Sequence, residues 1–184
     1  MTTQPFEQAV SVARGVLAGV SADQLGLETP CASWDVAALI NHIVAGQRFF
    51  LAALNSTPPV ESPDAAAGDF VATFDEVSSA CIAAFQADGV FERTFTLPFG
   101  EMPGGALLGL ATTDTFQHAW DLAKATGQDT DLAPELASAL LAQSQASISE
   151  AFRGPEGAPF GAEQAANEGA SAADQLAAFL GRTL

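Results

Sequence analysis

The chain is poor in several kinds of residue. Its 184 residues include no tyrosine, two cysteines, and only 6 Lys and Arg against 22 Asp and Glu, so its formal net charge is −16. Such a field repels phosphate backbones and anionic membrane surfaces, which excludes nucleic acid and membranes as partners. The acidity itself is most simply a well-solvated surface. Without tyrosine and with few runs of β-branched residues, the composition favours helices over strands.

Export and membrane signals are also missing. No uninterrupted apolar stretch reaches about 18 residues, and segment 1–7 lacks the basic start and apolar run of a signal peptide. We therefore predict a cytoplasmic protein. In a reducing compartment Cys31 and Cys81 are most simply buried small hydrophobes, although the start of the following helix would favour a thiolate at Cys31.

The apolar residues that are present predict an all-α fold. A hydrophobic share of 48% is ample for one well-buried domain. Apolar stripes at helical spacing, with proline, serine or glycine near their ends, predict five helices at about 5–20, 34–54, 68–87, 105–126 and 134–152. Ser33 is the predicted N-cap of the second helix, and Gly127 is the predicted end of the fourth.

Three segments break this helical pattern. Residues 55–67 are a proline-rich loop, and the alternating residues 90–103 predict an extended segment or a short hairpin. The tail 153–184 ends in a short amphipathic turn. We expect residues 1–152 to form a helical bundle that binds a metal, with 153–184 packed on it as part of the same domain.

Histidine is rare in this chain, and both copies lie in apolar, helix-patterned segments. Asp114 precedes His118 by four residues, so on a helix their side chains project from one face about 5–6 Å apart. If the helix that carries His42 packs alongside, one carboxylate and two imidazoles converge and leave coordination positions open. This donor set suits zinc, nickel or iron(II).

A structural role for these residues is the alternative interpretation. A histidine on an apolar helix is often a hydrogen-bonded core residue, and an acid four residues before a histidine also occurs as a helix-surface pair. Against this, the only two histidines occupy apolar positions in the middle of two different helices. A buried neutral imidazole needs partners for both ring nitrogens, and a metal with a supporting carboxylate satisfies both.

Four further residues are secondary candidates. Asp121 lies three residues after His118 and shares its face, so it is the candidate catalytic residue, as a supporting partner or general base, with a surface carboxylate as the alternative. Arg48 and Arg93 could anchor an anionic substrate or cofactor, or form ordinary surface ion pairs. Trp120 is predicted to be a packing residue whose indole N–H finds a local acceptor.

Two segments resemble the DinB/YfiT-like superfamily of helical bundles. The first is Thr29-Pro-Cys-Ala-Ser-Trp34 with the helix that follows it to His42, and the second is Asp114-Thr-Phe-Gln-His118-Ala-Trp-Asp121. They look most like the branch that contains the N-terminal domain of mycothiol-dependent maleylpyruvate isomerase and small actinobacterial proteins. Segments 97–104 and 178–182 also resemble that group of small proteins, so the resemblance covers most of the chain.

The resemblance implies a DinB-like four-helix bundle with a short extended or hairpin insertion and an additional C-terminal helix. It implies one divalent metal, most simply zinc or nickel, on His42, Asp114 and His118, although many relatives have histidine or glutamate at the position of Asp114. Relatives of known activity use the metal to hold the thiol of a small cofactor such as mycothiol as a thiolate that attacks an electrophile. The resemblance does not extend to the isomerase's separate C-terminal domain, so isomerase activity is not implied.

Three functions follow from these observations. The leading hypothesis is a metal- and thiol-dependent S-transferase, or a related isomerase-like enzyme, acting on a small electrophile. The second is a non-catalytic bundle that binds metal or ligand; such a bundle could form a homodimer through an apolar helix face. The third is a metal-dependent hydrolase, in which water replaces the thiol as nucleophile. In each case the expected partner is a small molecule.

Overall fold

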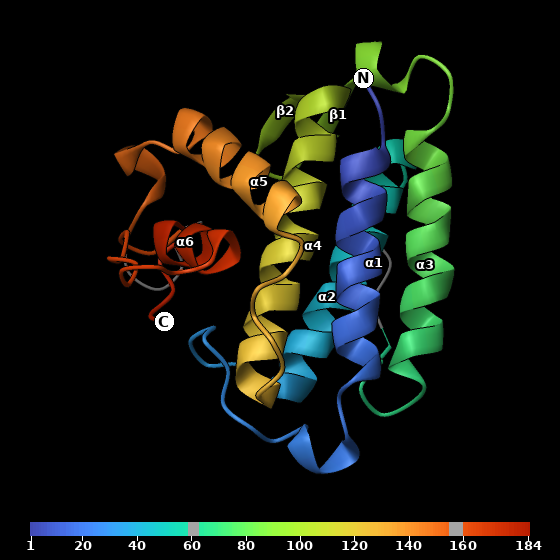
Figure 1. The fold of residues 1–184 in the computed structure, drawn as a ribbon. Helices are drawn as coiled ribbons and strands as arrows, with labels where there is room; N and C mark the ends of the chain where they lie inside the picture. Colours follow the sequence, from blue (N-terminus) through green and yellow to red (C-terminus); the bar gives the residue numbers. More distant parts are fainter. Residues whose placement is uncertain (59–62, 155–159) are drawn as a thin grey trace.

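Four long helices form the main bundle of the computed structural model, which describes residues 1–58, 63–154 and 160–184. They are α1 (Gln4–Ala18), α2 (Val36–Asn55), α3 (Phe70–Phe85) and α4 (Gly104–Thr126). Both α1 and α2 pack against α3 and α4, so the four helices surround one core. Figure 1 shows α2 and α3 running in the direction opposite to α1 and α4. The predicted all-α, DinB-like bundle is confirmed.

The core of the bundle is built from the apolar stripes of these helices. The stripe predicted on α1 is buried at Phe6, Val10, Ala13 and Leu17. By length and composition α2 could cross a membrane, but its apolar residues are shared with this core, including the fully buried Leu39 and Ile40. Its hydropathy is that expected of a helix enclosed by neighbours.

The start of α2 differs from the prediction. The helix begins at Val36, and the cap is Asp35, whose side chain accepts a hydrogen bond from the Ala38 amide at 2.8 Å. Ser33 instead adopts a left-handed conformation with φ 66°. The hydroxyl of Thr29 donates to the Trp34 carbonyl at 2.9 Å, so this carbonyl is hydrogen-bonded outside the helix.

The extended insertion is a short hairpin, as predicted. After a 3₁₀ turn at Val90–Glu92, strand β1 (Thr94–Leu97) pairs antiparallel with β2 (Gly100–Pro103), and α4 starts at the next residue. The helix ends at Gly127, which adopts the left-handed conformation with φ 71° that glycine accepts without strain. The hairpin therefore sets where α4 begins.

A second, smaller layer packs on the other side of α4. It contains α5 (Pro134–Ser147) and α6 (Ala172–Phe179), with an apolar cluster that includes Phe116 and Trp120 of α4 (Figure 1). The fifth helix is shorter than predicted, because the chain leaves helical geometry at Ile148 and forms only a 3₁₀ turn at Glu150–Phe152. Serine and β-branched residues at this end are weak helix formers.

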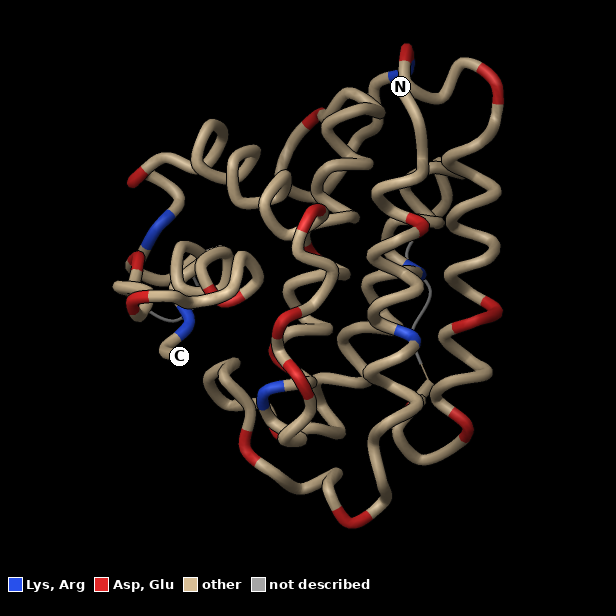
Figure 2. Tube along the Cα trace, viewed as in Figure 1, with Lys and Arg blue, Asp and Glu red and all other residues tan. Residues whose placement is uncertain are grey.

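The predicted amphipathic turn in the tail is the eight-residue helix α6. Parts of the predicted loop 55–67 and of the predicted tail, residues 59–62 and 155–159, lie outside the described residues. Figure 2 shows Asp and Glu positions spread around the whole outline of the fold, with few Lys and Arg positions among them. Acidic residues thus occur in many parts of the described fold rather than in one segment.

Candidate metal centre

His42 and His118 lie side by side on α2 and α4, as the sequence predicted they could. Their ring centroids are 4.5 Å apart. Asp114 lies between them, with its Oδ1 atom 3.9 Å from His42 Nε2 and 3.7 Å from His118 Nε2. The donor atoms of the three side chains all lie within 4.8 Å of one another.

This geometry fits a divalent metal ion. Two donors bound at 2.0–2.1 Å to one tetrahedral ion lie about 3.4 Å apart, so the separations of 3.9 and 3.7 Å are slightly longer than those of a filled site. They are too long for hydrogen bonds between the same atoms. The buried His42 Nε2 atom has no hydrogen-bond partner among the described residues, which is costly unless another group satisfies it.

The three side chains of the cluster differ in exposure. His118 is 12% exposed, whereas His42 is 35% and Asp114 is 27% exposed, so His118 is the enclosed member of the cluster and the other two side chains are in contact with solvent. Burial alone would raise the pKa of Asp114, but His42, His118 and Arg182 more than offset this, and its pKa lies below the ordinary value. The carboxylate is therefore ionised, as a metal ligand must be.

Asp121 supports His118 from the side away from the cluster. Its side chain is completely buried, and its Oδ2 atom lies 3.0 Å from His118 Nδ1. Burial opposes charge on His118, but contacts with Asp121, Cys31 and Asp114 outweigh it and raise the pKa of His118 to about 10. With Nδ1 held by a carboxylate, the ring presents Nε2 to Asp114, which is the usual arrangement behind a metal-bound histidine.

Arg182, near the C-terminus, neutralises the buried Asp121. Its guanidinium forms two hydrogen bonds to the carboxylate, Nε to Oδ1 at 3.1 Å and Nη2 to Oδ2 at 2.9 Å. Burial of Asp121 would raise its pKa, yet His118 and Arg182 together hold it well below the usual range. Gln117 adds a further hydrogen bond to Oδ1 at 3.2 Å.

Cys31 and Trp34 close the end of the site nearest the start of α2. The Cys31 thiol donates to Asp121 Oδ2 at 3.2 Å and lies 3.9 Å from His118 Nδ1. Trp34 packs on His42 with a centroid distance of 4.5 Å. Both residues also line a cavity of about 560 Å³ formed with neighbouring residues of segment 28–38. His42, Asp114 and His118 do not line this cavity; Cys31 and Trp34 are the residues that contact both the cavity and the two histidines.

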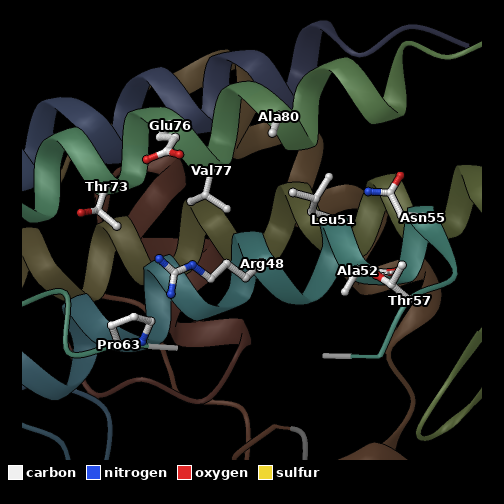
Figure 3. Close-up of a pocket in the computed structure, with 10 residues that line it drawn as sticks. All are labelled: Arg48, Leu51, Ala52, Asn55, Thr57, Pro63, Thr73, Glu76, Val77 and Ala80. Carbon is white, nitrogen blue, oxygen red and sulfur yellow. Dashed lines mark hydrogen bonds between the residues drawn. The ribbon is translucent and has the colours of Figure 1, made fainter. Parts of the chain in front are cut away.

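The two arginines suggested as anion anchors lie elsewhere. Arg48 is on the side of α2 that faces α3, where it lines a cavity of about 510 Å³ with Glu76 and Val77 (Figure 3). The Arg93 guanidinium lies 4.7 Å from the ring centroid of Phe95 and 3.5 Å from the Leu54 carbonyl. The structure therefore does not bring either residue to the cluster of His42, Asp114 and His118.

Arg182 is the residue of this site that sequence reasoning missed. It lies 61 positions after Asp121, so no helical spacing connects them. A signal was nevertheless present, because a chain with 6 Lys and Arg places one of them directly after the apolar segment 176–181. Trp120 was also only partly anticipated: its indole N–H donates to Asp174 Oδ1 of α6 at 2.8 Å rather than to a local acceptor.

Comparisons with known proteins agree with this architecture. The family model described as the mycothiol maleylpyruvate isomerase N-terminal domain matches residues 6–123. Two proteins from two strains of Mycobacterium tuberculosis, each described as uncharacterized, are 44% identical over 178 residues, covering 97% of this chain and 96% of theirs. The match therefore extends well beyond the bundle into the C-terminal layer.

Two crystal structures share the fold. Both are of the mycothiol-dependent maleylpyruvate isomerase, one of them a mutant, and they match with TM-scores of 0.59 and 0.56 at 16% and 17% sequence identity. The matched part covers 76% of this chain and 66% of the isomerase chain. At this identity the likeness concerns the fold.

Proposed function

The chain belongs to the family of the mycothiol maleylpyruvate isomerase N-terminal domain, and from this we propose that it binds one divalent metal ion and uses it in thiol-dependent chemistry on a small electrophile. His42, Asp114 and His118 are the proposed ligands. Two imidazole nitrogens and one carboxylate oxygen favour zinc or nickel among the metals that such a donor set accepts.

The observation that carries this proposal is the unpartnered His42 Nε2. The atom is buried, and it points to the same small space as Asp114 Oδ1 and His118. A core histidine would be expected to find a protein partner for this nitrogen. A metal ligand must instead keep it available until the ion binds.

The surrounding residues have distinct proposed tasks. Asp121 orients His118, because both of its oxygens already have partners and it is completely buried, which favours positioning over proton transfer. Trp34 shields one face of His42 from water. The cavity next to Cys31 and Trp34 provides room for the small thiol or its electrophilic partner.

The thiol part of the proposal comes from the family. A bound divalent ion supplies Lewis-acid stabilisation of a thiolate, which is the form of a thiol that attacks electrophiles. The isomerase of known structure depends on mycothiol, and we propose a small thiol of the same class as cofactor for this chain. Transfer of the thiol to the electrophile, or thiol-assisted isomerisation, is the resulting reaction class.

Metal analysis of the purified protein tests the binding step. We expect close to one zinc or nickel ion per chain, and His42→Ala, His118→Ala and Asp114→Asn should each lose it. Asp75→Asn is the matched control, because it removes an exposed carboxylate of α3 that pairs with Arg14 far from the cluster. A wild-type protein without affinity for zinc or nickel, or full metal content in either histidine variant, would contradict the assignment.

A turnover assay separates the three functional hypotheses. Consumption of mycothiol with a generic electrophile should depend on the metal and be lost in Asp114→Asn. Metal binding without such turnover would favour a non-catalytic binding module, and turnover without the thiol would favour a hydrolase. The proposed partners remain small molecules, since the charge of −16 disfavours nucleic acid and anionic membranes.

A further inference from the structure

We propose that Arg182 is a positioning residue for the metal site: by clamping Asp121 it fixes the orientation of His118, so the C-terminal layer is a working part of a site whose ligands all lie in the bundle. This inference rests on the proposed metal-binding function. It extends that function to a residue that lies beyond the 6–123 segment matched by the family model.

The clamp is specific in its geometry. The two hydrogen bonds run from two different nitrogens of one guanidinium to two different oxygens of one carboxylate, at 3.1 and 2.9 Å. This forked arrangement fixes the plane of the carboxylate and not merely its charge. Since Asp121 Oδ2 also holds His118 Nδ1 at 3.0 Å, fixing the carboxylate fixes the imidazole.

The guanidinium also contacts two members of a second group of side chains that could hold a cation. Cys31, His118 and Asp121 form a second group with metal-ligand atoms close together. Arg182 Nη2 lies 2.9 Å from Asp121 Oδ2 and 3.8 Å from Cys31 Sγ, so the cation that this group holds is an arginine. We therefore expect one metal ion, bound on the side of the His118 ring that faces His42.

The C-terminal segment is built to deliver this side chain. Two neighbouring residues of α4 hold the two ends of α6: Trp120 binds Asp174 in its first turn, and Asp121 binds Arg182 just after its last. Between α6 and Arg182 stands Gly181, with φ 98°, packed against Gly161 so closely that a Cβ atom would lie 2.7 Å from Gly161 Cα. The chain thus turns sharply where Arg182 must point back at α4.

An alternative role for Arg182 is purely structural. Asp121 is fully buried, and an unpaired buried carboxylate is strongly destabilising, so loss of Arg182 would weaken the fold whatever happens to the metal. The two roles differ in what they predict for metal affinity measured well below the unfolding temperature. A structural role leaves that affinity unchanged, whereas a positioning role weakens it.

The experiment compares four proteins by competition of Zn²⁺ with a chromophoric chelator at 10 °C: wild type, Arg182→Met, Arg182→Lys and Arg14→Met. Arg14 is half-exposed and pairs with Asp75 on the surface, so its removal matches the loss of charge without touching the site. We expect a dissociation constant raised by about 10–100-fold in Arg182→Met. Arg182→Lys should be intermediate, because lysine keeps the charge without the fork, and Arg14→Met should bind within about twofold of wild type.

The double variant Asp121→Asn/Arg182→Met keeps the test valid if Arg182→Met is unstable. It removes both charges, so its unfolding temperature should recover, whereas its Zn²⁺ affinity should stay weak because no anion orients His118. The visible spectrum of bound Co²⁺ should differ from wild type in the same variants, since it reports ligand geometry. Wild-type affinity in Arg182→Met or in the double variant would overturn the inference, whereas absence of binding in wild type would overturn the proposed function itself.

Discussion

The contacts of α4 with α1 and α2 are mainly apolar, and the histidine cluster and a buried hydrogen bond from Gln47 to Thr115 are polar exceptions. On the side of α4 that faces α5 and α6, two part-buried polar pairs join a smaller apolar cluster. The first side contributes Leu107, Ala111 and Leu122 to the bundle core. The second contributes Phe116 and Trp120 to the smaller cluster, together with the Trp120–Asp174 and Asp121–Arg182 pairs. The two layers thus hold the same helix by different means.

The difference has a physical meaning. Apolar contacts are not directional, so they stabilise the bundle without fixing any one side chain to a fraction of an ångström. A buried, hydrogen-bonded charge pair contributes less to the free energy of folding than apolar side chains of the same size, but it fixes the orientation of the groups that it joins. We infer that the bundle sets how far apart α2 and α4 lie, and that the C-terminal layer sets how His118 is turned.

Removing a large side chain from the bundle core should have the largest effect on stability. Phe74 of α3 is completely buried, and Phe74→Ala should lower the free energy of unfolding by about 3–5 kcal/mol, because it leaves a cavity among packed helices. Urea denaturation followed by circular dichroism measures this. Phe99→Ala is the matched control, since Phe99 is 64% exposed; equal losses in the two variants would contradict a bundle held by its core.

A cavity in the second layer should act locally. Leu176 of α6 is completely buried, and Leu176→Ala should cost about 2–4 kcal/mol. Hydrogen exchange followed by mass spectrometry should show protection lost in α5 and α6 but kept in α1 to α3. Affinity for Zn²⁺ should fall as well, because Arg182 follows this helix. Uniform loss of protection across all helices would show that the two layers do not differ as described.

Two glycines of the C-terminal segment offer a sharper comparison. Gly181 and Gly169 both have positive φ, 98° and 78°, so replacement by alanine should strain either by about 1–2 kcal/mol. A Cβ atom at Gly181 would also collide with Gly161, whereas nothing lies within 4 Å at Gly169. Thermal unfolding should therefore shift in both variants, but only Gly181→Ala should weaken Zn²⁺ binding. Equal Zn²⁺ affinities in Gly181→Ala and Gly169→Ala would show that the turn at Gly181 is not needed to place Arg182 on Asp121.

Loss of the other polar pair should have the smallest effect. Trp120→Phe keeps most of the buried ring but removes the hydrogen bond to Asp174, at a cost of about 1 kcal/mol. Zn²⁺ affinity should stay within a few-fold of wild type, since Arg182 still binds Asp121. The measurement is a paired unfolding and chelator-competition experiment, and a loss of affinity as large as that of Arg182→Met would assign the positioning to α6 as a whole.

The parts of this molecule that follow from local periodicity could be predicted from sequence. Asp114 and His118 lie four residues apart on one helix, and the apolar stripe around His42 predicts that α2 faces its neighbours. The hairpin between the third and fourth helices also followed, because its residues alternate and then turn. In each case the information lies within a few residues.

The parts that depend on distant partners could not be predicted. Both Ser33 and Asp35 are good caps, and the choice between them depends on a bond from Thr29 to Trp34 that no propensity encodes. Asp121 acquires its role from Arg182, which reaches it only after the chain has folded back through α5 and α6. The fifth helix ends early because the residues around Ile148 are weak helix formers. The prediction followed the apolar residues beyond this point and therefore made the helix too long.

Gly46 gives the candidate metal centre a constraint of a different kind. It lies one turn after His42 on α2, and a Cβ atom there would come within 3.2 Å of Asp114 Oδ2. Because Gly46 has no side chain, the backbones of α2 and α4 can lie close together at this point. The short side chain of Asp114 then reaches the histidines, whereas helices further apart would need a longer acid such as glutamate. The residues at positions 46 and 114 therefore depend on each other. Replacing Asp114 by glutamate would require a wider spacing of the helices at Gly46, and alanine at position 46 would crowd the aspartate. Substitutions at these two positions should be tolerated together more readily than singly.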